Sequence, residues 1–261
     1  MHSYTSKPTS SLKFSIITAT YNSADTIVSC LDSIASQTYR NIEHIVIDSV
    51  SSDNTLEKIK KHFFKHSKII CEIDDGIYDA LNKGIKHSTG DIIGFLHSDD
   101  FFSNSKVIEN IIKVFKENDA LSAVYGDCEF FSKTNTKKTI RKWQSRPFNS
   151  KLLKNGWMPP HAALYLRENV IKSVNGFDTS FKIAGDYMCI LKIFSKANFK
   201  AHYIPKVLLK MRMGGASNRS LLNIFLKTKE DWRALRENNF SFFLSVRVIL
   251  LKNLSKIVQF F

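Results

Sequence analysis

The sequence predicts an α/β fold in which a mixed, mainly parallel sheet is flanked by helices and followed by a C-terminal helical extension. Two observations support this prediction. Apolar runs of strand length alternate with helical patterns through the first half of the chain, and the connections between them are short. Several of these runs end in polar side chains, and α/β folds bind ligands beyond the carboxyl ends of their parallel strands.

The first half of the chain supplies strands and helices in alternation. Asn22 or Ser23 can cap the first helix, in which Ile27, Leu31 and Ile34 share one face. The fourth run is continuously apolar, which is typical of a strand buried on both faces. The strands are expected at residues 13–19, 43–48, 68–72, about 92–96 and 122–126, and the helices at 24–37, from 53 onward, 77–86 and 106–117.

The alternation breaks down after about Asp127. Trp157 to His161 is predicted to be a rigid loop because it contains two consecutive prolines. Further strands are expected at residues 139–144, 162–166 and 202–208, with a helix from 184 and helical structure after the glycine-containing loop at 214–217. These patterns divide the chain into a sheet domain, residues 1–218, and a helical extension, residues 219–261.

The charge and the cysteines limit the class of protein. The chain has 38 basic and 24 acidic residues, and its net charge of +14 favours an anionic partner: a nucleic acid, an anionic membrane surface or a phosphorylated substrate. The four cysteines are scattered without metal-ligand spacing, which indicates reduced thiols in the cytoplasm. The polar N-terminus and the absence of a long apolar run predict neither a signal peptide nor a spanning helix.

Two adjacent carboxylates, Asp99 and Asp100, follow the fourth strand. Neighbouring carboxylates repel each other and are costly to desolvate unless a cation neutralises them. A hard divalent ion such as Mn²⁺ or Mg²⁺, itself carrying a phosphate ligand, is the natural partner. The alternative is that this pair only ends the strand or caps the next helix at Ser105. The chain has no P-loop and no GxGxxG motif, which argues against NTPases and dinucleotide enzymes.

Several segments together resemble a known family. They are SIITATYN, SIASQTYRNIEHIVIDSVSSDNT, DDGIYDALNKGIKHSTGDIIGFLHSDD, HAALYL and GFDTSFKIAGDYMCIL, in this order between Phe14 and Ser217. They are similar to the family 2 inverting glycosyltransferases of the GT-A fold. Residues 1–218 would then form the GT-A domain. The GIYDALNKGI segment resembles the subgroup that assembles bacterial surface polysaccharide such as O-antigen, capsule or colanic acid.

The resemblance implies a nucleotide site at the first two strand ends. Thr18, Thr20 and Tyr21 would hold the base and ribose, although the same segment also reads as a helix-capping turn. Asp48 matches an acidic position used for uracil or ribose. Many relatives have two aspartates there, whereas this chain has Asp48 followed by Ser49, so the preference for uridine is less secure.

The third strand end has two interpretations. By resemblance, Asp79 or Lys83 contacts the nucleotide, and Asp75 lies near the sugar. Asp79 and Lys83 are also four residues apart on a predicted helix, where such a pair commonly forms a surface ion pair.

The acidic pair occupies the position of the family's DxD signature. One acid would contact the ribose, a role that suits Asp99, while Asp99 or Asp100 binds Mn²⁺ or Mg²⁺ bridging the diphosphate as a Lewis acid. The usual first acid is replaced by His97, which is either an auxiliary ligand or structural.

The resemblance also names the catalytic and acceptor residues. Asp186 matches the base that takes a proton from the acceptor hydroxyl, although it could instead cap the following helix. His161 and Trp157 match the acceptor or donor-sugar pocket, with a core histidine as the alternative for His161. Arg212 and Arg219 flank a loop that could close over the diphosphate or be a solvated linker.

The last segment, residues 238–261, is apolar and aromatic, with Arg247, Lys252 and Lys256 spaced through it. The pattern is typical of an interfacial helix whose cations face anionic headgroups, and the alternative is a helix that packs back on the domain. An interfacial helix suits the polyprenyl-diphosphate-linked saccharide that such enzymes commonly use as acceptor. It would place the protein at the inner face of the cell membrane.

The favoured hypothesis is therefore a metal-dependent inverting glycosyltransferase that uses a nucleoside-diphosphate sugar, most simply a UDP-sugar. A basic nucleic-acid-binding protein is the first alternative, but the basic residues are dispersed and no recognised module is present, so no nucleic-acid partner is expected. A nucleotidyltransferase is the second, but TATYNSAD lacks the glycines of a phosphate loop.

Overall fold

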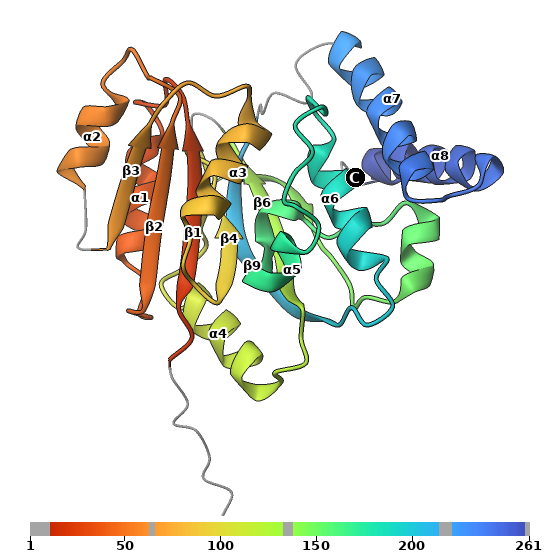
Figure 1. Cartoon of the computed structure of the whole chain (residues 1–261), viewed down its shortest axis with the longest axis horizontal. Helices are drawn as coiled ribbons and strands as arrows, with labels where there is room; N and C mark the ends of the chain where they lie inside the picture. The colour runs from red at the N-terminus through yellow and green to blue at the C-terminus, as the bar shows by residue number, and fades with distance from the viewer. Residues whose placement is uncertain (1–10, 63–65, 133–137, 214–220, 259–261) are drawn as a thin grey trace, which may run out of the picture.

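A single curved sheet with helices on both faces organises the molecule (Figure 1). The computed structural model describes residues 11–62, 66–132, 138–213 and 221–258. The strands are β1 (Phe14–Thr20), β2 (Ile42–Asp48), β3 (Ser67–Cys71), β4 (Ile92–Phe95), β5 (Phe101–Phe102), β6 (Ala123–Phe131), β7 (Thr139–Trp143), β8 (Leu164–Arg167) and β9 (Ala201–Arg212). The helices are α1 (Ile27–Ala35), α2 (Thr55–Lys61), α3 (Ile77–His87), α4 (Val107–Glu117), α5 (Glu168–Lys172), α6 (Gly185–Phe194), α7 (Leu221–Glu237) and α8 (Phe242–Val258), with 3₁₀ turns η1 (Ser150–Asn155) and η2 (His161–Ala163).

The first four long strands form a parallel block in the order β3-β2-β1-β4. In the register of this block, Thr20 lies opposite Asp48, and Asp48 lies opposite Cys71. The amide of Ser49 donates to the carbonyl of Thr20, and the amide of Leu96 donates to that of Ile17. The polar residues that end these strands therefore meet at one edge of the sheet, as the sequence predicts.

The second half of the sheet mixes directions. β8 runs antiparallel to both β4 and β6, and β9 runs parallel to β6 and antiparallel to β5. This arrangement confirms the mixed α/β class with flanking helices. The strand β5 and the helix α5 were not predicted, because elements of two and five residues carry too little periodicity to be recognised.

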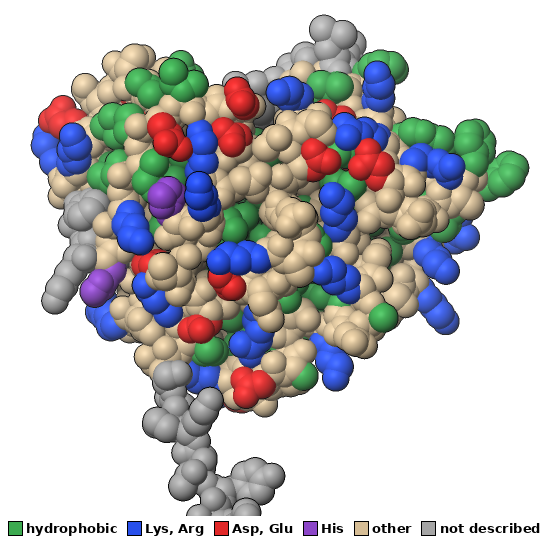
Figure 2. Space-filling view, viewed as in Figure 1, with side chains coloured by type: hydrophobic (Ala, Val, Ile, Leu, Met, Phe, Trp, Pro, Cys, Tyr) green, Lys and Arg blue, Asp and Glu red, His purple; other side chains and the backbone are tan. Residues whose placement is uncertain are grey.

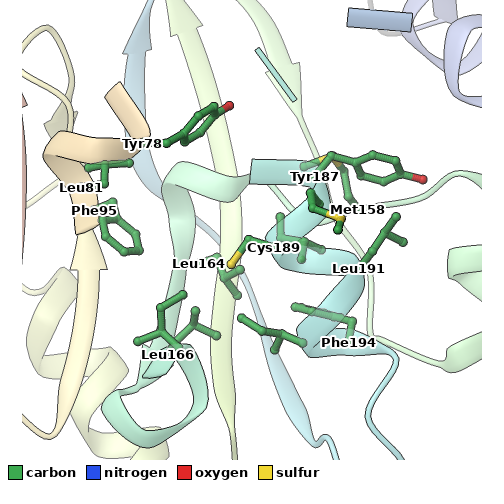
Figure 3. Close-up of a cluster of buried hydrophobic side chains, with 14 of the residues drawn as sticks. Tyr78, Leu81, Phe95, Met158, Leu164, Leu166, Tyr187, Cys189, Leu191 and Phe194 are labelled. Carbon is green, nitrogen blue, oxygen red and sulfur yellow. The ribbon is translucent and has the colours of Figure 1, made fainter. Parts of the chain in front are cut away.

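Hydrophobic cores lie on both faces of the sheet. Ile16 and Ile17 are neighbours on β1 that point to opposite faces, and both are fully buried. Ile16 packs in the core under α1, α2 and α4, whereas Ile17 packs in the core under α3 and α6. Figure 3 shows side chains of α3, β4, β8 and α6 meeting in the second of these cores.

The helices α7 and α8 share this second core. Ala234 and Leu235 on α7 and Val248 on α8 are fully buried members of it. Lys252 on α8 is also buried, and its Nζ lies 2.8 Å from Oδ1 of Asp231. The expectation that Lys252 faces lipid headgroups is therefore wrong, because its charge is neutralised inside the protein. No helix in the described ranges is both long and apolar enough to cross a membrane.

Candidate active site

The loops that follow β1 and β2 are tied together at the strand-end edge. The amide of Asn22 donates to Ser51 Oγ at 2.9 Å, and Oδ1 of Asn22 accepts from the amide of Ser52 at 2.9 Å. Asn22 and Val50 both have positive φ, of 46° and 55°. A β-branched residue in this region is strained, and such strain is concentrated at functional sites. The two loops thus form one preorganised rim.

Thr20 ends β1 at this rim, and Tyr21 follows it. The Tyr21 side chain is 62% exposed, which leaves its ring available to a ligand. The Thr20 hydroxyl is buried and has no hydrogen-bond partner among the described residues. Tyr21 is therefore accessible to a ligand at this rim, whereas the contact of Thr20 with base or ribose stays a prediction.

Thr18 lies deeper in the sheet, whereas Asp48 is level with Thr20 but is buried. Thr18 is fully buried, and its Oγ1 lies 3.0 Å from Nε2 of the buried His44. This position does not fit the predicted nucleotide contact, because Thr18 is two residues inside the strand and the core surrounds it. Asp48 is also fully buried and accepts hydrogen bonds from the amide and hydroxyl of Ser51, at 2.8 and 2.6 Å. In this structure Asp48 stabilises the conformation of the loop that carries Val50.

At the third strand end, Lys83 forms the ion pair that the sequence allowed. Its Nζ lies 3.1 Å from Asp79 and 3.3 Å from Glu72, and it donates to the carbonyl of Ile73. Asp79 in turn accepts from the amide of Asp75 at 3.1 Å. These contacts hold the loop between β3 and α3, and the exposed Asp75 lines a small hollow beside that loop.

The acidic pair lies in a tight turn at the end of β4. The amide of Asp100 donates to the carbonyl of His97 at 3.0 Å, and the Asp100 side chain is buried. Its Oδ1 accepts from the amide of Arg212, at the end of β9, at 3.1 Å. Its Oδ2 is buried without a hydrogen-bond partner in the described part of the chain. Burial, followed by the charge of Asp99, raises the pKa of Asp100 well above its usual range.

These carboxylates fit a divalent ion whose remaining ligands come from the substrate. No group of three or more His, Cys, Asp or Glu ligands occurs among the described residues, so the protein alone does not build a full cage. Mg²⁺ is usually held by only one or two carboxylates together with substrate phosphates. A buried, unpartnered carboxylate oxygen beside a second acid is the feature that such an ion would neutralise.

A second group of titratable side chains lies beside the acidic pair. Nδ1 of His161 lies 3.0 Å from Oδ2 of Asp186, although the angle does not suit a hydrogen bond. The rings of His97 and His161 are 6.1 Å apart. Burial, followed by the proximity of His161, lowers the pKa of His97, while Asp99 and Asp186 oppose that shift. His161 thus lies close both to Asp186 and, through the His97 ring, to the acidic turn.

Asp186 lies in the first turn of α6. The residue that caps this helix is Ala184, so the interpretation of Asp186 as the cap is wrong. Oδ1 of Asp186 accepts from the amide of Tyr187 at 2.8 Å, and its side chain is 22% exposed. One oxygen is thus fixed by the backbone while the other faces His161.

The remaining predicted residues are placed differently. The Trp157 ring packs with those of Tyr125 and Phe148, each at 5.9 Å, in a position that suits the core better than a sugar site. Arg212 lies over the Phe131 ring at 4.9 Å and contacts Asp100 through its amide, which places it at the acidic turn. Arg219 lies outside the described residues.

Comparison with known proteins identifies the family. The model of glycosyl transferase family 2 matches residues 15–173, which is more than half of the chain. The chain belongs to glycosyl transferase family 2. An uncharacterized glycosyltransferase of Mycobacterium tuberculosis is 32% identical over 186 residues, which cover 70% of each chain. WfgD of Escherichia coli, a UDP-Glc:alpha-D-GlcNAc-diphosphoundecaprenol beta-1,3-glucosyltransferase, is 31% identical over 85% of this chain and 84% of its own.

Solved structures show the same fold for this family 2 glycosyltransferase. Staphylococcus aureus TarS (1-349) in complex with UDP-GlcNAc superposes with a TM-score of 0.68 at 18% identity, over 93% of this chain and 72% of that one. The mannosyltransferase PcManGT of Pyrobaculum calidifontis, in complex with GDP-Man and Mn²⁺, gives 0.64 at 19% identity, over 94% and 70%. The fold is GT-A, as the resemblance implied.

The structure of this family 2 glycosyltransferase also reveals polar residues at the site that the sequence did not indicate. Ser98 lies in the acidic turn, and its Oγ is 2.9 Å from that of Ser23 in the loop after β1. The Tyr78 hydroxyl donates to the carbonyl of Ile183, just before α6, at 2.7 Å. Tyr78 belongs to the GIYDALNKGI segment, so its position in that motif was a usable signal, whereas Ser98 had none.

Proposed function

We propose that this protein is an inverting glycosyltransferase that moves a sugar from a nucleoside diphosphate, with UDP favoured, to a lipid-linked saccharide during bacterial surface polysaccharide assembly. The observation that carries the proposal is the proximity of two acidic groups with different surroundings. In the acidic turn Asp100 is buried and Asp99 is half-buried, whereas Asp186 is partly exposed with its Oδ2 3.0 Å from His161, whose ring lies 6.1 Å from that of His97 in the same turn.

In the proposed donor site, the base and ribose lie against Tyr21 and Thr20, with Asp99 near the ribose. Asp100, with or without Asp99, would hold Mn²⁺ or Mg²⁺ beside the diphosphate, and Arg212 lies at the same turn. The ion would act as a Lewis acid that stabilises the departing diphosphate. The UDP-GlcNAc complex of TarS and the Mn²⁺ complex of PcManGT, which share the fold, support this assignment.

In the proposed reaction, Asp186 is the general base. The acceptor hydroxyl attacks the anomeric carbon, its proton passes to the Asp186 carboxylate, and the bond from that carbon to the diphosphate oxygen breaks. A single displacement inverts the anomeric centre, so an α-linked donor gives a β-linkage. The relative WfgD, a beta-1,3-glucosyltransferase with a diphosphoundecaprenol-linked acceptor, supports both the linkage and the acceptor class.

The experiment is a transfer assay with purified protein, a synthetic GlcNAc-diphosphate-lipid acceptor, and UDP-, GDP- and dTDP-sugars with and without Mn²⁺. We expect transfer from a UDP-sugar, and we expect Asp186→Asn to lower kcat roughly 100- to 10,000-fold while UDP still binds. Asp119→Asn is the matched control, because the Asp119 side chain is 93% exposed. Full transfer by the Asp186→Asn variant would rule out the proposed base.

The outer face of α8 suits the proposed position at the inner membrane face. Phe243, Leu250 and Leu254 are 83%, 59% and 57% exposed, and they share a helix face with Arg247. Figure 2 shows hydrophobic side chains gathered at this edge of the molecule, with Lys and Arg nearby. Residues 238–261 contain no Asp or Glu, so the surface complements anionic lipid. We include this membrane contact in the proposal.

A further inference from the structure

The backbone segment that leads into α6 is held by a side chain from the C-terminal helices. Glu230 lies on α7 and is 7% exposed. Its Oε1 accepts a hydrogen bond from the amide of Lys182 at 2.8 Å. Its Oε2 accepts from the amides of Ile183 and Ala184 at 2.9 and 2.7 Å. One carboxylate therefore binds three consecutive amides.

This arrangement is specific to a carboxylate. A buried charge is costly unless it is hydrogen-bonded, and here amides supply the donors to both oxygens of Glu230. The negative charge also lies at the N-terminus of α6, where the helix dipole favours it. Ala184 directly precedes α6, and Asp186 follows two residues later in the first turn. Glu230 therefore fixes the backbone from which Asp186 projects.

The same segment is held from the other side by α3. The Tyr78 hydroxyl donates to the carbonyl of Ile183 at 2.7 Å, so this residue is bound at both its amide and its carbonyl. A Cβ atom at Gly185 would lie 2.7 Å from the Tyr78 ring, which shows how closely the backbone approaches it. The residues before Asp186 are thus clamped between Tyr78 and Glu230.

We propose that Glu230 is a positioning residue for Asp186. It holds the entry to α6 so that the Asp186 carboxylate faces His161 and the acceptor hydroxyl, and it takes no part in bond making. The inference rests on the proposed function of Asp186. On this inference α7 contributes to catalysis indirectly, because Glu230, which holds the backbone before Asp186, lies on this helix of the C-terminal extension.

The decisive variant is Glu230→Gln. Glutamine keeps the size of the side chain but replaces one acceptor oxygen with an NH₂ group that faces amide donors. We expect kcat to fall roughly 10- to 100-fold, because small displacements of a reacting group have effects of this size. We expect KM for the donor and the Kd for UDP to stay unchanged. Glu237→Gln is the matched control, since Glu237 is an exposed residue of the same helix whose side chain bonds Arg233.

A purely structural role is separated by a double-mutant comparison. If Glu230 acts through Asp186, Glu230→Gln removes little more from the residual rate of the Asp186→Asn variant. An equal fold-loss in both backgrounds, or a wild-type kcat in folded Glu230→Gln protein, would overturn the proposal. Tyr78→Phe is the second variant if Glu230→Gln does not fold. It should lower kcat without changing UDP affinity, and an unchanged kcat would count against the clamp.

The outcomes also separate this inference from the proposed function. Full transfer by the Asp186→Asn variant would contradict both the role of Asp186 as the base and the positioning role of Glu230. A strong loss with Asp186→Asn, combined with a wild-type rate for Glu230→Gln, removes the positioning role alone.

Discussion

Asp100 is a buried carboxylate with only one of its two oxygens hydrogen-bonded in the described part of the chain. Its Oδ1 accepts the Arg212 amide, while Oδ2 is buried and unpartnered in the described part of the chain. Burial and the neighbouring Asp99 raise its pKa, so its ionised form is disfavoured in the unliganded protein. Sites of this kind commonly trade stability for activity.

The Asp100→Asn variant should show that trade directly. Asparagine keeps an acceptor for the Arg212 amide and removes the charge, so we expect the unliganded protein to gain about 1 kcal/mol in free energy of unfolding. We expect transfer to fall at least about 100-fold because the proposed divalent ion would lose a ligand. Thermal melting with and without UDP and Mn²⁺ is the measurement, and Asp119→Asn is the control. Equal stabilisation of variant and wild type by UDP with Mn²⁺ would contradict this role.

Single residues show how far a sequence motif can predict a site. Asp99, Asp100, His161 and Asp186 lie in recognisable segments, and the structure places His161 beside Asp186 and near the His97 ring of the acidic turn, while the roles of these residues stay predictions. Thr18 lies in an equally recognisable segment, yet its hydroxyl meets His44 in the core. A motif gives the order of residues along a strand, but tertiary packing decides how far along the strand the exposed edge begins.

Among the elements, β1, β2 and the turn before β4 are joined by Glu43, which is buried at the start of β2. Its carboxylate accepts from Ser15 Oγ at 2.5 Å and from the amide of Thr89 at 2.6 Å, and it lies 2.6 Å from Lys13 Nζ. Burial alone would raise the pKa of Glu43, but these hydrogen bonds outweigh it and lower the pKa to about 2.

A lowered carboxyl pKa predicts a defined loss of stability in acid. In the unfolded chain the pKa of Glu43 is 4.5, so as the pH falls the unfolded chain takes up the proton before the folded protein does. The contribution of ionised Glu43 to the free energy of unfolding is therefore complete above about pH 4.5 and is lost as the pH falls toward 2. We expect this contribution to be of order 2 kcal/mol. Urea unfolding of wild type and Glu43→Gln between pH 2 and 7 is the measurement, and the curves should converge in acid. A gap that is constant across this pH range would show that Glu43 does not act through its charge.

Element prediction succeeded where periodicity was long enough to read. The strands at β1, β2 and β4 and the helices α3 and α4 follow from apolar spacing, since one or both faces of each are buried. The order in which β8, β6 and β9 join the sheet could not be read from the chain, because it depends on pairings between distant segments. The arrangement that places Asp186 beside His161 depends on those pairings.

For the whole molecule, the helices α7 and α8 have two unlike faces. The inner face carries Val248 and the buried Lys252, which pairs with Asp231. The outer face carries Phe243, Leu250 and Arg247. The core-helix interpretation of the tail is therefore correct for the inner face, and the interfacial-helix interpretation stays a prediction for the outer face.

Vesicle co-sedimentation tests the outer face. We expect the protein to bind vesicles containing phosphatidylglycerol, more weakly at high salt, because Arg247 and its neighbours contribute charge attraction. Phe243→Ser and Leu250→Ser should each weaken binding about tenfold, since each removes apolar surface that would enter the lipid. Ile140→Ser, on the exposed face of β7, should leave binding unchanged. Equal binding by all three variants would exclude this face as the contact.

The hydrogen bonds from the segment before α6 to Glu230 have a consequence for the choice of substrate. One rigid pair of helices would carry both the lipid-facing surface and the anchor of the base, so the height of Asp186 above the bilayer would be set by the fold. A glycan hanging from a membrane lipid presents each of its hydroxyls at its own height. An enzyme built in this way would select an acceptor by the distance of its hydroxyl from the bilayer as well as by its shape. Adding one sugar between the lipid and the accepting residue would then move the correct hydroxyl out of reach.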